Sequence, residues 1–176
     1  MPQEGKKCNT NLLQNLILRE LLRDPTVGIN EIAKRAGTYR QRVWRLKKKL
    51  EEEKAIWGYT PVLAEEKFGH QQYIILLKLK PMNEKLASLM IKRIKQGEPA
   101  TYEVRLINVV YVNGDFDWIV IFSAPDRMRA KKYYESLRIN YDNYLLEKPV
   151  LLDINMFLVR EGKVNPEMDM LLEMVP

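Results

Sequence analysis

The sequence contains little of what builds a metal centre, a disulfide framework or a membrane span. Its 176 residues include one cysteine and one histidine, Cys8 and His70. One thiol cannot form an intramolecular disulfide, and this pair supplies too few ligands for a Cys/His zinc site. No apolar run approaches the ~18 residues of a membrane span, and the start, "MPQEGKKCNTN", lacks the apolar stretch of a secretory signal. We therefore expect no metal, no membrane partner and a reducing, cytoplasmic setting.

Catalytic patterns are also missing. The sequence has no glycine-rich phosphate-binding loop, and we expect no cofactor. Asp115 and Asp117 form an acidic pair beside Gly114, but no further residue pattern makes this pair catalytic. They are typical of a turn residue and a strand-end residue, although an acid beside a glycine could also hold the ammonium group of a ligand. We predict that the chain is not an enzyme.

Positive charge is confined to one part of the chain. Residues 1–60 carry the entire formal excess of +6, whereas residues 61–176 contain equal numbers of basic and acidic side chains. This asymmetry favours a two-part chain whose basic part meets a polyanion. The alternative is a neutral body that simply carries a basic end.

The sequence of the basic part predicts three helices. Apolar residues at helical spacing predict a helix over 9–24, capped by Asn9, Thr10 or Asn11, and a second over 29–36. A third begins near residues 38–39. Ala33, Gly37, Val43 and Leu46 follow the spacing A-x3-G-x5-V-x2-L: a small residue where two helices cross, a glycine turn, and two residues that bury the second helix. This is the packing logic of a DNA-binding helix-turn-helix, and the alternative is a purely structural helical hairpin.

The third helix is predicted to be amphipathic. On a helical wheel its buried face contains Tyr39, Val43, Leu46 and Leu50. The opposite face contains Gln41, Trp44, Arg45 and Lys48, flanked by Arg40 and Lys49. The three glutamates that follow, 51–53, are expected to be solvated.

This outer face suggests specific roles on double-stranded DNA. Arginine suits guanine and glutamine suits adenine in the major groove, whereas lysines contact phosphates. The candidate base readers are Arg40, Gln41 and Arg45, together with Arg42 and Trp44. The candidate phosphate contacts are Lys47, Lys48 and Lys49. Thr38 and Tyr39, at the start of the helix, complete the set of DNA-binding candidates. For Trp44 the alternative is packing on a neighbouring strand, and for the lysines it is solvation.

The remainder predicts a second module. Residues 57–69 are predicted as a linker strand, which Pro61 restricts to an edge or to exchange with a partner. From there to residue 162 the order βαββαβ implies a ferredoxin-like sheet with both helices on one side. Within it, Asn113–Gly114 predicts a type I′ hairpin turn, and the last strand is expected to place Val150, Leu152, Ile154, Met156 and Leu158 on one face. The bare, apolar sheet face predicts a homodimer.

These motifs together resemble the Lrp/AsnC (leucine-responsive, feast/famine) family of transcription regulators over roughly residues 11–160. "INEIAKRAG" resembles the family's LA-x3-G helix, "VWRLKKKLEEEKAIWGYTPVL" its run into the linker, and "VNGDFDWIV" its glycine–acid turn. The fold class is thus α+β: a helix-turn-helix (winged-helix-like) domain at 1–56, the linker, a ferredoxin-like effector and oligomerisation domain at 70–162, and a tail at 163–176. In the tail we expect a short helix with Met168, Leu171 and Leu172 inward.

The resemblance implies homodimers, often assembled into larger rings, that bind DNA and take small effectors, usually amino acids. Gly114, Asp115 and Asp117 occupy the glycine–acid turn and are the effector-binding candidates. Two departures stand out: Tyr39 replaces the family's usual serine, leaving Thr38 to cap the third helix, and "LLDINMFLV" replaces a threonine-rich final strand that can contribute to the effector site.

Two alternatives remain. One is a metabolite-sensing oligomeric protein whose helix-turn-helix has lost DNA binding. The other is an enzyme resembling siroheme decarboxylases, which share this two-part architecture, although the chain lacks a histidine-bearing motif such as theirs.

Overall fold

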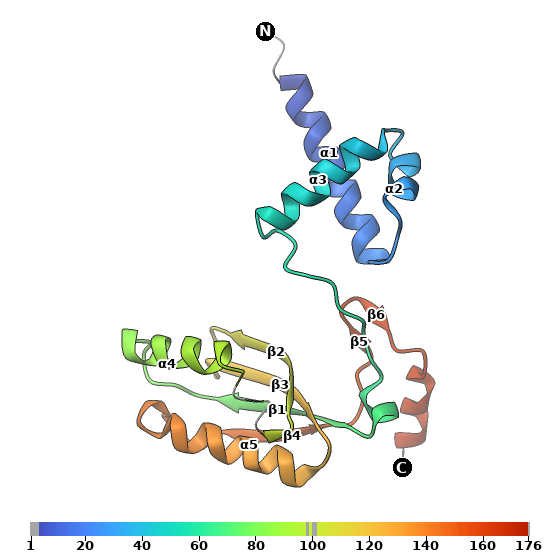
Figure 1. Ribbon diagram of the computed structural model, residues 1–176. Coiled ribbons are helices and arrows are strands. Elements are labelled where there is room, and N and C mark those ends of the chain that lie inside the picture. The colour runs from blue at the N-terminus through green and yellow to red at the C-terminus, as the bar shows by residue number, and fades with distance from the viewer. Residues whose placement is uncertain (1–3, 98, 100–101, 176) are drawn as a thin grey trace. The chain divides into compact units, whose positions relative to one another are not determined.

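Residues spaced three and four apart build the core of an N-terminal helical unit. The computed structural model describes residues 4–97, 99 and 102–175, and it divides the chain into units at Met1–Val62 and Leu63–Pro176. In the first unit, α1 (Glu4–Arg23), α2 (Ile29–Arg35) and α3 (Arg40–Glu52) enclose one apolar cluster (Figure 1). Its fully buried members are Ile17, Ile32 and Val43, one from each helix. The first helix begins earlier than predicted, so residues 9–11 lie inside it.

The turn between α2 and α3 has the geometry that Gly37 was expected to provide. Gly37 has φ +59°, a left-handed conformation that glycine adopts without a steric penalty. The Thr38 N–H donates to the Ala33 carbonyl at 3.0 Å and the Gly37 N–H to the Lys34 carbonyl at 3.2 Å. These two bonds form a Schellman motif that ends α2 and sets the direction in which α3 starts.

The end of α3 has the same Schellman motif, but its left-handed position is occupied by a lysine instead of a glycine. Lys54 has φ +58°, and the Ala55 N–H donates to the Leu50 carbonyl at 2.9 Å. A lysine in this conformation is strained because its Cβ crowds the backbone. We therefore expect Lys54→Gly to raise the free energy of unfolding of the helical unit by about 1 kcal/mol, measured by denaturant titration. The matched substitution Lys49→Gly, inside α3, should lower the free energy of unfolding by a similar amount. If both substitutions changed the free energy of unfolding in the same direction, this explanation would be contradicted.

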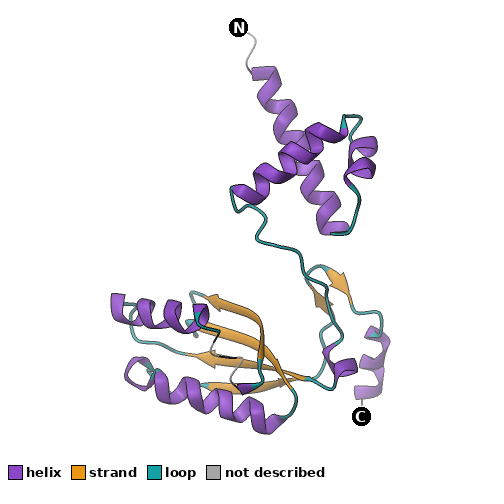
Figure 2. Cartoon of the chain, viewed as in Figure 1, coloured by secondary structure: helices purple, strands orange, loops and turns teal. Residues whose placement is uncertain are grey.

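The second unit contains a four-stranded antiparallel sheet. Its strands are β1 (Gln71–Leu77), β2 (Arg105–Tyr111), β3 (Trp118–Ala124) and β4 (Val150–Ile154), in the order β2-β3-β1-β4. Helices α4 (Glu84–Lys95) and α5 (Arg127–Asn140) supply buried residues to one cluster with the inward side chains of the strands. Both helices cover the same sheet face (Figure 2). The predicted α+β class, with a helix-turn-helix and a ferredoxin-like module, is confirmed.

Alternation along the strands decides which side chains are buried. Tyr73, Ile75 and Leu77 of β1 are buried under the helices. Asn83 caps α4, its Oδ1 accepting from the Leu86 N–H at 3.0 Å. Gly97, with φ +66°, follows that helix. The helix α5 is capped in the same way by Asp126, whose Oδ1 accepts from the Arg129 N–H at 2.8 Å.

Two predictions about strands differ from what the single chain shows. Residues 57–69 were predicted as a linker strand. In the single chain they contain an extended segment and then a 3-10 helix, η1 (Glu65–Phe68), but no strand. A strand forms only beside a neighbouring strand, and pairing with a second chain stays a prediction. Strand β4 ends at Ile154, because that residue pairs with Gln72 near the start of β1. Met156 and Leu158 therefore lie beyond the sheet.

The tail also differs from expectation. After a short hairpin, β5 (Val159–Arg160) and β6 (Lys163–Val164), it forms a 3-10 helix, η4 (Met168–Met174). None of the residues of η4 is buried, so Met168, Leu171 and Leu172 do not point inward. Apolar spacing predicted a helix there, but the side chains of that helix are exposed in the described chain.

A buried acid holds the linker onto the second unit. Glu65 in η1 is only 3% exposed and forms ion pairs with Arg105 of β2 and Arg160 of β5. Arg160 also donates through Nη1 to the Leu63 carbonyl at 3.1 Å. A buried carboxylate requires such partners, because leaving it unpaired would cost several kcal/mol. Leu63 and Glu65 are thereby fixed to the sheet and to the C-terminal hairpin.

Candidate nucleic-acid interface

The outer face of α3 is exposed to solvent. Gln41, Arg45 and Lys48 are exposed, and Trp44 is 49% exposed. Val43 and Leu50 are buried on the opposite side, with Leu46 half-buried. The sequence pattern therefore placed the two faces correctly, except for Tyr39.

Tyr39 does not belong to the buried face. It is 84% exposed and precedes α3 at the N-cap position, with φ −87° and ψ 144°. The wheel assumed helical geometry for a residue that has an extended backbone. Thr38 is not the cap either, and no side chain caps α3. The first N–H groups of α3 therefore lack a side-chain acceptor among the described residues, which suits a phosphate oxygen.

The lysines and glutamates of α3 pair with one another. Salt bridges link Lys47 to Glu51 at 3.0 Å, Lys48 to Glu52 at 3.6 Å and Lys49 to Glu53 at 3.5 Å. Each pair is spaced i,i+4 with the glutamate on the C-terminal side, a spacing that brings side chains together on a helix surface. The expectation that 51–53 are merely solvated is wrong, and the repeat KKKLEEE contained the signal.

The arginines differ from these lysines. Within the described part of the chain, Arg40, Arg42 and Arg45 have no ion pair, and all three are exposed. An exposed ion pair contributes about 0–1 kcal/mol, so Lys48 and Lys49 can exchange glutamate for phosphate at little cost. The arginines can bind an anion without breaking any pair.

Trp44 makes a contact that sequence reasoning did not consider. The Lys48 ammonium lies 5.4 Å from the centre of its ring. No strand lies beside it within the described residues of the helical unit, so the alternative of packing on a neighbouring strand finds no support. Its ring remains exposed on the face that contains Gln41 and Arg45.

Lys47 belongs to a second cluster, at the end of α3. Tyr59 from the linker donates its hydroxyl to Glu51 Oε1 at 3.0 Å, and the Lys47 ammonium lies 4.8 Å from the Tyr59 ring centre. The hydrogen bond from Lys47, and then that from Tyr59, lowers the pKa of Glu51. Burial lowers the pKa of Lys47, but its bonds to Glu51 and Tyr59 outweigh burial and raise it. This group, Lys47–Glu51–Tyr59, fixes the linker to the recognition helix.

The effector candidates lie in the loop between β2 and β3. Residues 112–117 separate the two strands, and neither Asn113 nor Gly114 has positive φ, so the predicted type I′ turn is wrong. Asp117 explains the longer loop: its Oδ2 accepts from the Leu79 N–H at 2.7 Å, and its own N–H donates to the Leu77 carbonyl at 3.0 Å. The Asp117 carboxylate thus holds the loop to the end of β1, whereas Gly114 and Asp115 are exposed.

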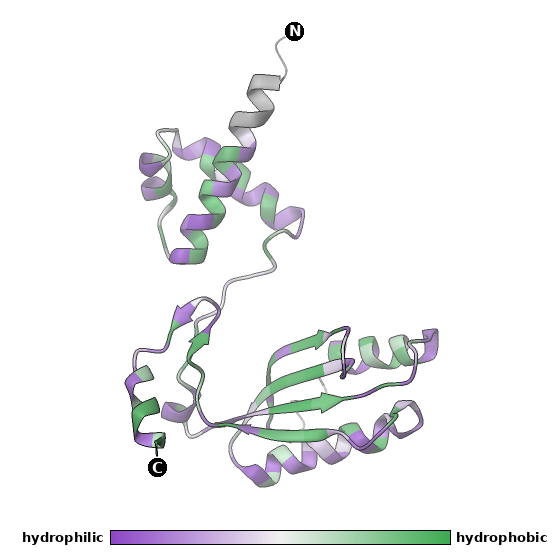
Figure 3. Ribbon diagram, turned by 180° about the vertical axis from the view of Figure 1, so that it is seen from behind, coloured by the Kyte–Doolittle hydropathy of each residue, from purple (hydrophilic) through white to green (hydrophobic). Residues whose placement is uncertain are grey.

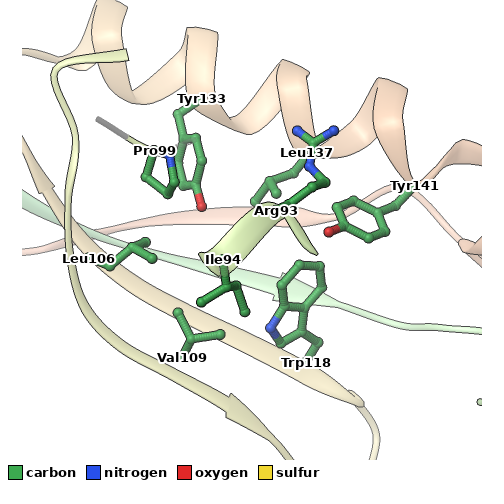
Figure 4. Close-up of a pocket in the computed structure, with 9 residues that line it drawn as sticks. All are labelled: Arg93, Ile94, Pro99, Leu106, Val109, Trp118, Tyr133, Leu137 and Tyr141. Carbon is green, nitrogen blue, oxygen red and sulfur yellow. The ribbon is translucent and has the colours of Figure 1, made fainter. Parts of the chain in front are cut away.

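A small cavity lies between the helices and the sheet (Figure 4). It has a volume of about 20 Å³ and is lined by residues that include Trp118, Tyr133 and Tyr141. The buried Trp118 Nε1–H has no hydrogen-bond partner among the described residues. This volume suits about one water molecule, so it does not accommodate an amino acid.

The described residues contain no group of three or more His, Cys, Asp or Glu side chains placed to hold a metal ion. Over the same part of the chain, none of the helices is sufficiently long and apolar to cross a membrane.

The two units together define a helix-turn-helix protein with an attached ferredoxin-like module. Residues 11–56 match the family model described as winged helix-turn-helix DNA-binding, a span that includes α2, α3 and their turn. No curated protein matches the chain.

The fold of the chain is similar to that of solved Lrp/AsnC regulators. The leucine response regulatory protein of Mycobacterium tuberculosis is 17% identical, with a TM-score of 0.68 over 88% of this chain and 98% of that one. An AsnC family transcriptional regulator from Agrobacterium tumefaciens is 17% identical, with a TM-score of 0.62 over 88% and 96%. A feast or famine regulatory protein from M. tuberculosis, solved in complex with L-methionine, is 17% identical, with a TM-score of 0.67 over 88% and 97%.

Proposed function

We propose that the chain is a sequence-specific DNA-binding transcription regulator of the Lrp/AsnC family, acting in the cytoplasm as a homodimer. The observation that carries this proposal is the exposed face of α3, where Gln41, Trp44 and Arg45 lie on the second helix of a helix-turn-helix. The match of residues 11–56 to a DNA-binding family model supports it. The rival with lost DNA binding is disfavoured by the three unpaired arginines on this helix.

Salt dependence of duplex binding tests this proposal. Each phosphate that the protein neutralises contributes about −0.9 to the slope of log affinity against log salt. Three contacts per recognition helix, from the arginines and lysines of α3, make six in the proposed dimer and would lower the affinity roughly 2,000-fold between 50 and 200 mM salt. Fluorescence anisotropy with a labelled duplex measures this slope. A slope near zero would exclude a phosphate-contacting interface.

The dimer is proposed to form through the bare sheet face. Two cross-strand rows cover this face: Leu152, Ile74, Ile121 and Asn108, then Val150, Leu76, Ile119 and Val110. Val110 and Leu152 are each 43% exposed, and the central isoleucines are half-buried. The strands are strongly apolar (Figure 3), and a second copy that covers them would remove this apolar area from water.

We extend the proposal to a small amino-acid effector, supported by the L-methionine complex of one structural relative. The exposed carboxylate of Asp115 beside Gly114 provides an anion for an ammonium group, while Asp117 shapes the loop. We expect free amino acids of at least one type to raise the melting temperature of the wild-type protein, and Asp115→Asn to reduce this shift. Glu161→Asn, at an exposed turn of the C-terminal hairpin, serves as the control. An unchanged shift in Asp115→Asn would remove Asp115 from the site.

The enzyme alternative is not favoured. The structural relatives named above are described as regulators, and the one histidine, His70, is half-buried just before β1. Absence of tetrapyrrole binding by the purified protein, followed by absorbance, is the expected result. A tight coloured complex would instead support the enzyme alternative.

A further inference from the structure

A shallow groove runs along the outer side of α5. Its volume is about 420 Å³, and its lining includes Tyr102, Met128, Lys131, Lys132 and Ile139. Met128 and Ile139 are 61% and 64% exposed. Two large apolar side chains at such exposure are unusual on a helix that otherwise presents charge, and they indicate a surface that another molecule covers.

This groove lies in a basic layer. Helices α4 and α5 contain nine basic and two acidic residues, although residues 61–176 as a whole are neutral. Lys131 and Lys132 are exposed, and neither has an ion pair among the described residues. The partner that fits is therefore acidic and apolar at once.

The tail of the same chain has this chemistry. Residues 165–176 contain Glu167, Asp169 and Glu173 and no basic residue. Glu167 is paired with Lys67 of η1 at 2.6 Å, whereas Asp169 and Glu173 have no ion pair within the described part of the chain. Two unpaired acids thus match the two unpaired lysines of the groove.

The apolar side chains of the tail are arranged to cover a partner. With three residues per turn in a 3-10 helix, Met168, Leu171 and Met174 share one stripe of η4. Leu172 of η4 is 74% exposed, and Val175, which follows η4, is 69% exposed. Isolated 3-10 helices of seven residues are uncommon, and no residue of η4 is buried in the single chain. Methionine-rich surfaces adapt readily to a neighbouring shape.

We propose that the tail of one copy of this chain, residues 168–175, docks in the α5 groove of a second copy. The occupant is a second copy because each chain carries both complementary surfaces. The groove has two unpaired lysines, and the tail has two unpaired acids. The contact joins two different patches, so it is heterologous and repeats from copy to copy. It therefore builds assemblies larger than the dimer proposed to form through the sheet face, and it does not depend on DNA binding.

A charge-swap experiment on the full-length protein tests this contact. One variant carries Lys131→Glu and Lys132→Glu, and the other carries Asp169→Lys and Glu173→Lys. Sedimentation velocity at about 50 mM salt, where surface charges are weakly screened, should show that the wild type assembles beyond the smallest species and that each variant alone does not. An equimolar mixture of the two variants should reassemble, because each tail then meets a groove of opposite charge.

The matched control is Lys85→Glu with Lys92→Glu, which makes the same charge change on exposed positions of α4 outside the groove. It should assemble like the wild type, and circular dichroism should show that all variants are folded. The proposal is overturned if the wild type does not grow beyond the species that the tail variant forms, if either variant alone assembles normally, or if the mixture fails to recover.

Discussion

Arg45→Ala is expected to weaken binding to a preferred duplex by about 1–3 kcal/mol, roughly 5- to 150-fold, and to relax the preference for one base. Arg45 lies at the centre of the exposed face of α3 and has no ion pair among the described residues. A bidentate arginine on guanine fixes that base, because no other base pair presents the same two acceptors in the major groove. Selection from a random duplex library defines the preferred sequence, and anisotropy with the selected and mismatched duplexes gives the two affinities.

Arg42→Ala is the matched control. On the helical wheel Arg42 lies between the exposed face and the buried Val43, which suits a phosphate contact. Its removal should weaken preferred and mismatched duplexes alike and lower the salt slope by about 1. If Arg45→Ala behaved in the same way as Arg42→Ala, Arg45 would be a phosphate contact and not a base reader.

Ile121→Asp is expected to convert the proposed dimer into monomers, raising its dissociation constant at least about 100-fold. Ile121 lies in the middle of a cross-strand row, between Ile74 and Asn108. An unpaired carboxylate buried in an apolar interface costs about 3–5 kcal/mol, and each copy in a symmetric dimer contributes one. Analytical ultracentrifugation measures the dissociation constant, and DNA binding should weaken with it, because two linked recognition helices bind more tightly than one.

Ile91→Asp makes the same change at a 54%-exposed position on α4, in the helix layer. It should leave the dimer intact, which separates loss of the interface from a general effect of charge. A dimer that persists in Ile121→Asp would place the interface elsewhere.

Patterns that depend on neighbours in the sequence predicted most of this structure. The spacing of Ala33, Gly37 and Val43 fixes the helix-turn-helix because one helix crossing and one turn determine all three positions. Strand and helix order likewise predicted the ferredoxin-like module. Failures arose where a distant contact decides the geometry. Asp117 bonds to Leu79, which lengthens the loop at Asn113–Gly114, and β4 ends at Ile154, whose partner Gln72 lies one residue from the start of β1.

In the candidate site, too, local sequence spacing predicted some features and missed those that depend on distant residues. Periodicity separated the outer from the inner residues of α3, but it could not tell that Tyr39 has an extended backbone just before the helix. It also could not reveal that Tyr59 contacts the Lys47–Glu51 pair, since Tyr59 lies beyond the end of α3. The i,i+4 pairing of the lysines with the glutamates could have been predicted, since it depends only on sequence spacing.

The linker is held at both ends, and in the proposed dimer this would limit the DNA sites that the protein recognises. Tyr59 is bound to α3 through Glu51, and the Leu63 carbonyl is bound by Arg160, so only residues 60–62 are unattached. Four backbone steps span at most about 14 Å, and Pro61 removes one rotation from this short tether. A pair of recognition helices on such tethers has little freedom to follow a change in half-site spacing. One inserted base pair moves a half-site by about 3.4 Å and turns it about the duplex axis, so operators should tolerate mismatches better than insertions.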